Sequence, residues 1–105
     1  MIRMTIILKP FSSKVSEFAQ TMEGLIKELR KEPGCIHYRF QRESKNKFSL
    51  DSDWNTKEEL EAHFQSSLFN ILLGAFHALC EQPEVKITDG PKTSGMEMIE
   101  AARNK

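Results

Sequence analysis

Apolar positions repeat with two different periods along the chain, and each change of period marks a new element. Residues 2 to 9 are rich in β-branched side chains and end at Lys9-Pro10, which predicts a strand. Ser12 or Ser13 can then cap a helix, which Pro33-Gly34 ends. Apolar residues at steps of three and four predict one buried stripe on this helix. The stripe consists of Val15, Phe18, Met22, Leu25, Ile26 and Leu29.

Two segments with alternating side chains follow and predict a β-hairpin. The strands cover residues 34 to 42 and 47 to 54, and the polar stretch 43 to 47 joins them. One face of the hairpin is largely apolar and carries Ile36, Tyr38, Phe40, Phe48, Leu50, Ser52 and Trp54. The other face is polar, so it is either exposed to solvent or paired with a second subunit. In the second case, Arg39 or His37 of one copy would lie opposite Asp51 or Asp53 of the other.

The second half of the chain predicts two helices and a last strand. Thr56 and Glu59 match the spacing of a capping box, so a helix begins directly after Trp54. Its side chains Leu60, His63 and Phe64 are expected to face the core. Ser66 can cap a further helix in which Gly74 marks a bend. The apolar residues of that helix are Phe69, Leu72, Leu73, Phe76, Leu79 and Cys80, and a strand at 85 to 88 follows.

The order β-α-β-β-α-β predicts an α+β, ferredoxin-like fold, in which helices cover one face of a four-stranded antiparallel sheet. Residues 1 to 90 form this domain, and residues 91 to 105 form a C-terminal tail. The weak amphipathicity of the tail fits either a short helix that docks on a neighbour or a loose segment. Because the uncovered sheet face also carries apolar residues, we expect a homodimer that pairs through this face.

Charge and composition exclude several classes of function. The 105 residues include 15 basic and 15 acidic side chains, and this balance argues against nucleic acid as a partner. No apolar run is long enough for a membrane span, and no signal peptide is recognisable, so we expect a cytoplasmic protein without a membrane partner. Cys35 and Cys80 are interpreted as free thiols. The three histidines lack the spacing of a metal site, so no metal is predicted.

The quoted residues resemble the antibiotic biosynthesis monooxygenase family, within the dimeric α+β barrel group. The resemblance covers roughly residues 2 to 88. Its most specific parts are Pro33-Gly34-Cys35, Tyr38, the segment from Phe48 to Trp54, Leu60-Glu61-Ala62-His63-Phe64, Ser66 and Phe69. Similar proteins include oxygenases of quinols and anthrones that use no cofactor, haem-degrading enzymes, a sugar-phosphate isomerase and proteins without known activity. The fold alone therefore does not specify the reaction.

For the quinol or anthrone branch, the resemblance implies a site in which His63 accepts a proton and Trp54 provides a flat wall and an N–H donor. No cofactor is required, because the substrate carbanion itself reduces oxygen. The apolar pocket would suit a small aromatic ligand. Its expected lining consists of Tyr38, Phe40, Phe64, Phe69, Leu73, Phe76 and His77. The anthrone oxygenases have an Asn four residues before the Trp, and here that position is Leu50.

Two other interpretations stay open at the level of the sequence. Haem degradation is disfavoured, because the first strand has no Asn, His63 replaces the expected Trp, and Leu73 lies near the position of the iron ligand. The chain can also be a non-catalytic dimer that binds a small ligand or supports a pathway. In that case Trp54 is a core or interface anchor, and His63 is a hydrogen-bonded histidine near the core.

Overall fold

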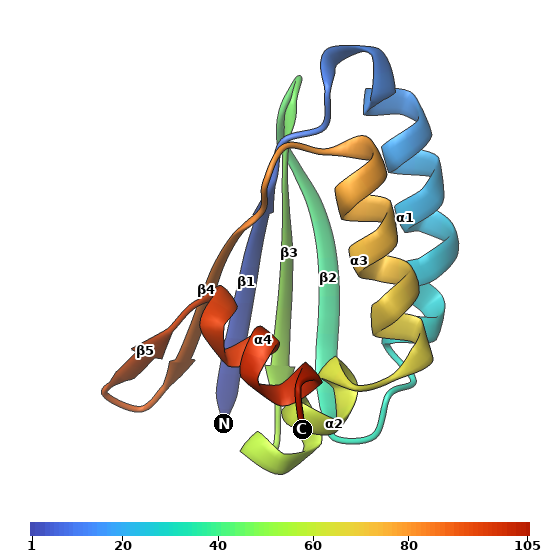
Figure 1. Cartoon of the computed structure of the whole chain (residues 1–105). Helices are drawn as coiled ribbons and strands as arrows, with labels where there is room; N and C mark the ends of the chain where they lie inside the picture. Colours follow the sequence, from blue (N-terminus) through green and yellow to red (C-terminus); the bar gives the residue numbers. More distant parts are fainter.

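Five strands form one antiparallel sheet, and the α-helices pack against one of its faces (Figure 1). The computed structural model describes all 105 residues. The elements are β1 (Ile2–Leu8), the short 3-10 helix η1 (Ser12–Lys14), α1 (Val15–Leu29), β2 (Cys35–Ser44), β3 (Lys47–Trp54), α2 (Lys57–Phe64), α3 (Ser67–Leu79), β4 (Glu84–Asp89), β5 (Lys92–Ser94) and α4 (Met96–Arg103). The strand order β2-β3-β1-β4-β5 confirms the ferredoxin-like arrangement, to which β5 adds a fifth strand.

A single core of 22 buried hydrophobic residues fills the space between the sheet and its helices. Strand β1 contributes every second residue, from Ile2 to Leu8, because alternate side chains of a strand point to the same face. Phe18 of α1 lies edge-on to Phe48 with ring centroids 5.4 Å apart, and its ring is 6.4 Å from that of Phe76 on α3. These contacts join α1, α3 and the sheet into one unit.

Helix α1 begins and ends differently from the prediction. Ser12 and Ser13 lie inside η1, and α1 starts at Val15 without a side-chain cap. The helix ends at Leu29, and Pro33-Gly34 instead forms the centre of a turn in which the Cys35 N–H donates to the Glu32 carbonyl at 3.1 Å. Gly34 has φ +81°, the value that the third residue of a type II turn requires. The Pro33-Gly34 pair, which was predicted to end the helix, therefore forms the turn that leads into β2.

Strand β2 departs from simple alternation at its start. A register shift lies between Cys35 and His37, which pair with the adjacent residues Trp54 and Asp53. Ile36 is consequently 50% exposed, whereas the sequence placed it on the core face. From Tyr38 onward the side chains of β2 alternate between the core face and the open face as predicted, and β3 has the predicted bounds.

Both helices after β3 begin where the sequence predicts. The Thr56 hydroxyl oxygen accepts the Glu59 N–H at 3.1 Å, and the Ser66 hydroxyl oxygen accepts the Phe69 N–H at 3.1 Å. As expected, Leu60, His63 and Phe64 are buried. Helix α3 continues without interruption through Gly74, where a bend was predicted.

The C-terminal tail packs on its own chain. Strand β5 pairs with β4, and α4 lies against α2 and β4 with Ile99 and Ala102 buried. The Arg103 guanidinium donates to the Phe64 carbonyl at 2.8 Å, which fixes the end of α4 to α2. The tail therefore covers one end of the helical layer (Figure 1). No helix of the structure combines the length and the apolar character that a membrane crossing requires.

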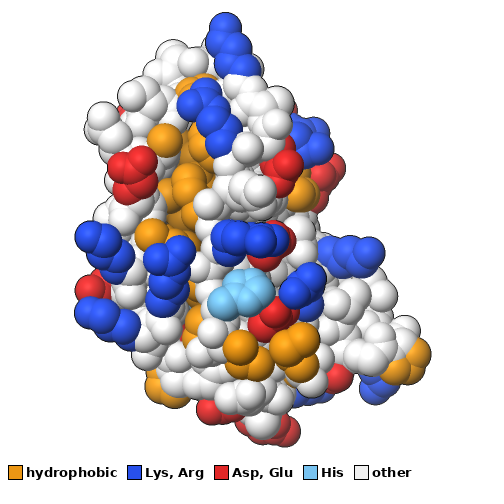
Figure 2. Space-filling model, turned by 180° about the vertical axis from the view of Figure 1, so that it is seen from behind, with side chains coloured by type: hydrophobic (Ala, Val, Ile, Leu, Met, Phe, Trp, Pro, Cys, Tyr) orange, Lys and Arg blue, Asp and Glu red, His pale blue; other side chains and the backbone are white.

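Charged side chains on the open face of the sheet pair with each other across neighbouring strands of the same chain. The Arg3 guanidinium makes two hydrogen bonds to Asp53, at 2.8 and 3.0 Å. His37 Nδ1 lies 3.2 Å from the same carboxylate. The hydrogen bond from Arg3 lowers the pKa of Asp53. Figure 2 shows this face, where acidic and basic side chains alternate around a histidine.

Replacing Gly34 by alanine is expected to destabilise the protein by about 2 kcal/mol or more. The substitution strains the positive φ, and the added Cβ would lie 2.3 Å from the Glu59 side chain. Gly24→Ala is the matched control, because this glycine lies in α1 with open space around it. The control should gain about 0.5 to 1 kcal/mol. Urea unfolding of both variants measures the difference, and equal free energies of unfolding would contradict the expectation.

Candidate active site

The residues predicted for the site fall into three separate places in the fold. His63, Trp54, Tyr38, Phe64 and Phe69 form a buried aromatic cluster around α2. Leu73, Phe76 and His77 line a pocket beside α3. Phe40 lies apart from both, stacked on Phe48 at a centroid distance of 5.1 Å. The structure thus separates the two predicted catalytic residues from the largest pocket.

The aromatic cluster is held together by His63, which projects from α2 toward the end of β3. Its imidazole stacks on Trp54 with centroids 4.6 Å apart, and Phe69 lies edge-on to it at 4.9 Å. Nε2 is 3.0 Å from the Tyr38 hydroxyl, and Nδ1 is 3.4 Å from the Glu32 carboxylate. A neutral ring satisfies both contacts, since Nδ1–H donates to Glu32 and Nε2 accepts the Tyr38 proton.

Burial controls the protonation of this cluster. It lowers the pKa of His63 from 6.5 to about 4, against the opposing effect of the Glu32 carboxylate. Burial likewise raises the pKa of the Tyr38 phenol far above its ordinary value. The Trp54 side chain is fully buried, and its indole N–H donates to the Ser52 hydroxyl at 2.9 Å. The cluster therefore consists of uncharged groups whose polar atoms already have partners.

A small pocket of about 250 Å³ touches the outer edge of the cluster. It is lined by Glu32, Pro33, Glu59, Ala62 and His63. Trp54 does not reach this pocket, and two carboxylate side chains border it. At about 250 Å³, the small pocket is below the usual size of a site for a drug-sized ligand.

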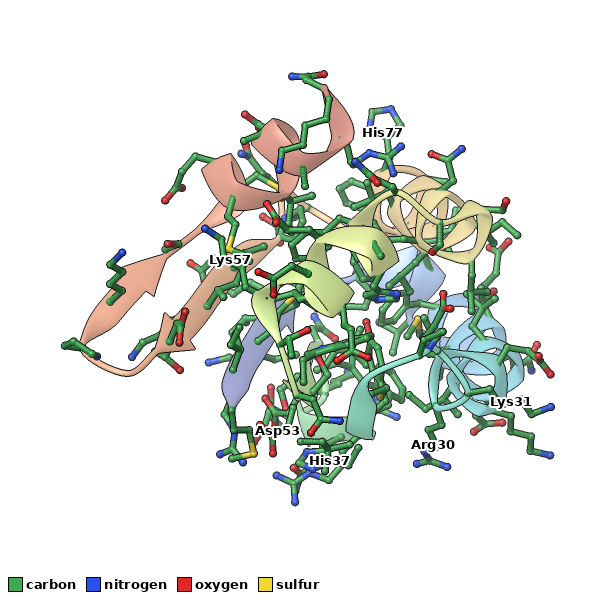
Figure 3. All side chains as sticks on the ribbon, turned by 90° about the horizontal axis from the view of Figure 1, so that it is seen from below. Arg30, Lys31, His37, Asp53, Lys57 and His77 are labelled. Atoms are coloured by element: carbon green, nitrogen blue, oxygen red, sulfur yellow. The ribbon has the colours of Figure 1, made fainter.

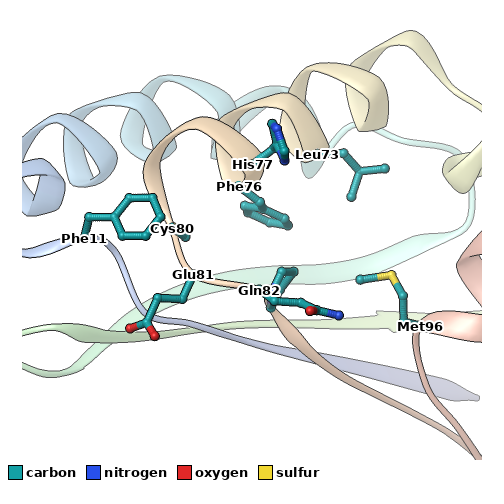
Figure 4. Close-up of a pocket in the computed structure, with 9 residues that line it drawn as sticks. Phe11, Leu73, Phe76, His77, Cys80, Glu81, Gln82 and Met96 are labelled. Carbon is teal, nitrogen blue, oxygen red and sulfur yellow. The ribbon is translucent and has the colours of Figure 1, made fainter.

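The larger pocket has a volume of about 460 Å³ and lies between α3, the loop that follows α3, and α4 (Figure 4). Its walls are mainly apolar, and the polar groups come from the loop and from His77 on α3. The lining residues are Phe11, Leu73, Phe76, His77, Cys80, Glu81, Gln82, Pro83 and Met96. Volume and lining both match a small, flat organic ligand.

Two backbone hydrogen bonds fix the loop that forms the pocket's polar side. The Phe11 N–H donates to the Leu79 carbonyl, and the Glu81 N–H donates to the Lys9 carbonyl, each at 2.9 Å. Pro10 and Cys80 form a β-bridge between them. Burial raises the pKa of the Cys80 thiol to about 11, so it stays protonated at neutral pH. His77 is exposed, and it is the imidazole of this pocket.

Sequence reasoning missed the lining residues that come from outside α3. Phe11 precedes η1, and Met96 begins α4, so neither lies on an element that was assigned to a site. Their apolar side chains gave no signal of a pocket, because only the folded chain brings them to α3. No group of three or more histidine, cysteine, aspartate or glutamate side chains is arranged to hold a metal ion.

The fold and this pocket define a ferredoxin-like α+β protein with an open, ligand-sized pocket beside α3. The family model described as antibiotic biosynthesis monooxygenase matches residues 1–78. The chain belongs to this family. An uncharacterized protein of Synechocystis is 33% identical over 83 residues, which cover 76% of this chain. The matched residues cover 56% of the Synechocystis protein, so this chain spans about half the length of that relative.

Solved structures share the same fold. A conserved protein from Methanosarcina mazei has a TM-score of 0.76 and 27% identity, covering 83% of this chain and 89% of its own. A crystal structure of an antibiotic biosynthesis monooxygenase has a TM-score of 0.77 and 18% identity, covering 86% of this chain and 98% of its own. This second likeness shows the shared fold alone.

The buried His63 is expected to make stability depend on pH. Its pKa is about 4 in the folded protein and 6.5 in the absence of burial, so the unfolded chain binds the proton first. The contribution of the neutral His63 to the free energy of unfolding is complete above about pH 6.5, falls as the pH decreases, and is lost below about pH 4. It amounts to about 3 kcal/mol across this range.

Urea unfolding of the wild type and of His63→Phe, measured at several pH values, tests this expectation. The free energy of unfolding of the wild type should fall more steeply toward acid than that of the variant, because phenylalanine cannot take up a proton. Parallel pH profiles for the two proteins would rule out a buried neutral His63.

Proposed function

We propose that this chain is an oxygenase that acts without a cofactor on a small quinol- or anthrone-like aromatic bound in the larger pocket. The observation that carries the proposal is the combination of apolar walls with one imidazole. Phe76, Leu73 and Met96 offer flat or flexible apolar surface, and His77 lies on the same wall as Leu73 and Phe76 (Figure 4). Membership of the antibiotic biosynthesis monooxygenase family supports the same class of reaction.

The proposed reaction needs a base within reach of the substrate. His77 accepts the first proton from the substrate, either from the CH2 carbon of an anthrone or from the hydroxyl group of a quinol, which leaves an anion with carbanion character at the reacting ring carbon. The carbanion supplies the electrons that reduce O₂, and a carbon–oxygen bond forms. The resulting peroxide recovers the proton from His77 and then loses water, which removes the one hydrogen that remains on the oxygenated carbon. One oxygen atom ends in the new carbonyl group and the other in water.

The contacts of His63 and Trp54 support a structural role for both residues. A base is most effective when its pKa is close to the working pH, and burial holds that of His63 at about 4. The Trp54 N–H is already bound to Ser52. In this proposal the two residues hold α2 on the sheet and thereby set the position of α3, which carries Leu73 and His77.

A homodimer through the open sheet face is part of the proposal. Ile7 is partly buried on this face although no helix covers it, and Asp53 is nearly inaccessible there. Figure 3 shows His37 and Asp53 on the side of the molecule away from His77. A second copy would cover the open face and leave the pocket free.

Oxygen uptake with a panel of reduced quinones and anthrones tests the proposed activity. The wild type should exceed spontaneous oxidation, and His77→Gln should lower kcat by about 100-fold or more, since positioned bases contribute at least that much. His37→Gln is the matched control, because this histidine lies on the opposite face. A rate that depends on His63→Phe and not on His77→Gln would assign the proton transfer to the buried cluster. Absence of any rate above background would defeat the oxygenase proposal.

Filling the pocket is the second arm of the same experiment. Leu73→Trp places a large side chain in the pocket and should raise KM by about tenfold or more by removing space for the ligand. Ile71→Trp introduces the same side chain on the exposed surface of α3 and should behave like the wild type. Equal KM values for the two variants would place the substrate elsewhere.

The mass of the particle in solution tests the dimer. Light scattering should give twice the protomer mass of 12.1 kDa for the wild type. Ile7→Arg should give the protomer mass, because a buried and unpaired charge at the interface is strongly unfavourable. Ile71→Arg adds the same charge on α3 and should remain dimeric. A wild type that has the protomer mass at micromolar concentration would contradict the proposal.

A further inference from the structure

Two parts of the chain form the wall of the larger pocket, and only one of them lies within the family match. The lining residues inside the matched residues 1–78 are Phe11, Leu73, Phe76 and His77. The lining residues beyond the match are Cys80, Glu81, Gln82, Pro83 and Met96. Met96 is the one that a separate helix, α4, brings to the pocket. Membership of the family therefore does not account for this part of the wall.

Hydrogen bonds at both ends of α4 fix the backbone that carries Met96. At the start of the helix, the Met98 N–H donates to the Gly95 carbonyl at 3.1 Å. At its end, the Arg103 guanidinium donates to the Phe64 carbonyl at 2.8 Å and holds α4 on α2. The fold thus sets the position at which the Met96 side chain begins. Beyond that point the side chain is an unbranched thioether, which adapts its shape to a neighbouring group.

Met96 closes one end of the pocket. Phe11 and Met96 lie at opposite ends, with Phe76 and Cys80 between them (Figure 4). A flat ligand that lies along these side chains therefore meets Met96 at one end and Phe11 at the other. The Phe11 side chain is 43% exposed, whereas Met96 is half-buried and packs against the hydrophobic core. The end at Met96 is consequently the more closely defined of the two.

We propose that Met96 determines the length of the aromatic ligand that the larger pocket holds. An apolar pocket discriminates between ligands by the contacts that fit and the overlaps that do not. A shorter side chain at residue 96 leaves room for a further ring and removes a contact from a ligand that ends before it. A larger side chain does the opposite. The inference rests on the proposed function only for the pocket being the ligand site, and it adds the residue that selects substrates by their number of rings.

Binding without turnover tests this selectivity. Fluorescence titration in the absence of oxygen compares 2-naphthol, which has two fused rings, with 2-anthrol, which extends the same ring system by one ring in a line. Met96→Ala should raise the affinity for 2-anthrol relative to that for 2-naphthol by about threefold or more. Met96→Trp should lower the same ratio by about tenfold. A ratio that is equal in the wild type and in both variants would overturn the assignment.

Met98→Ala and Met98→Trp are the matched controls, because Met98 is a half-buried methionine of the same helix that packs against the core and does not line the larger pocket. Their affinity ratio should stay within about twofold of that of the wild type. Equal shifts for the Met96 and Met98 variants would trace the effect to a displacement of α4 and overturn the assignment. A larger shift for Phe11→Ala than for Met96→Ala would overturn it as well, since the opposite end would then limit the ligand.

The outcomes for selectivity and for the oxygenase are separable. Binding that depends on Met96 without oxygen uptake by any substrate would preserve the selectivity and defeat the catalytic proposal. Oxygen uptake that requires His77, together with an affinity ratio that is indifferent to residue 96, would do the reverse. If neither compound binds, or if Leu73→Trp leaves the binding of both unchanged, the pocket is not the ligand site and both proposals fail.

Discussion

The stack of His63 on Trp54 is the contact on which the arrangement of the helical layer depends. Trp54 ends β3, and His63 belongs to the helix that begins three residues later, so their stacking turns α2 back against the sheet at once. Phe69 packs on the same imidazole and brings the first turn of α3 to this point. The direction of α3 along the sheet follows, and with it the position of the pocket that α3 forms with the loop after it and with α4.

The same burial that makes His63 a good anchor makes it a poor base. A neutral imidazole can form hydrogen bonds to Glu32 and Tyr38 through its two nitrogens without placing a charge in the core. Desolvation keeps the ring neutral. Proton exchange with a ligand needs the opposite properties: access, and a nitrogen that is free to accept. His77 has that access on α3. One short stretch of chain thus provides a structural histidine and an accessible one, and the difference between them is their depth in the fold.

Local rules recovered most of the framework from the sequence. The alternation in β3 and the caps at Thr56 and Ser66 depend on neighbouring residues only, and the structure has them as predicted. The shift near Ile36 was not visible, because Cys35 and Ile36 are both acceptable on a core face and the pairing with β3 decides between them. The pocket was also beyond local rules. Leu73, Phe76 and His77 were predicted to line a pocket and do line one, but Phe11 and Met96 join them only through tertiary folding.

Net charge describes this molecule poorly, because its charges are distributed in two different ways. On the open face of the sheet, Arg3 and Asp53 neutralise each other between adjacent strands, so that a carboxylate can be nearly buried at little electrostatic cost. At the edge of the larger pocket, Glu81 is exposed to water and Lys9 lies opposite it, next to the β-bridge between Pro10 and Cys80. A paired surface can be covered by another protein without leaving an isolated charge, whereas exposed charges at the edge of a pocket are screened by water and salt. The distribution of charge therefore favours a protein contact on the open face of the sheet.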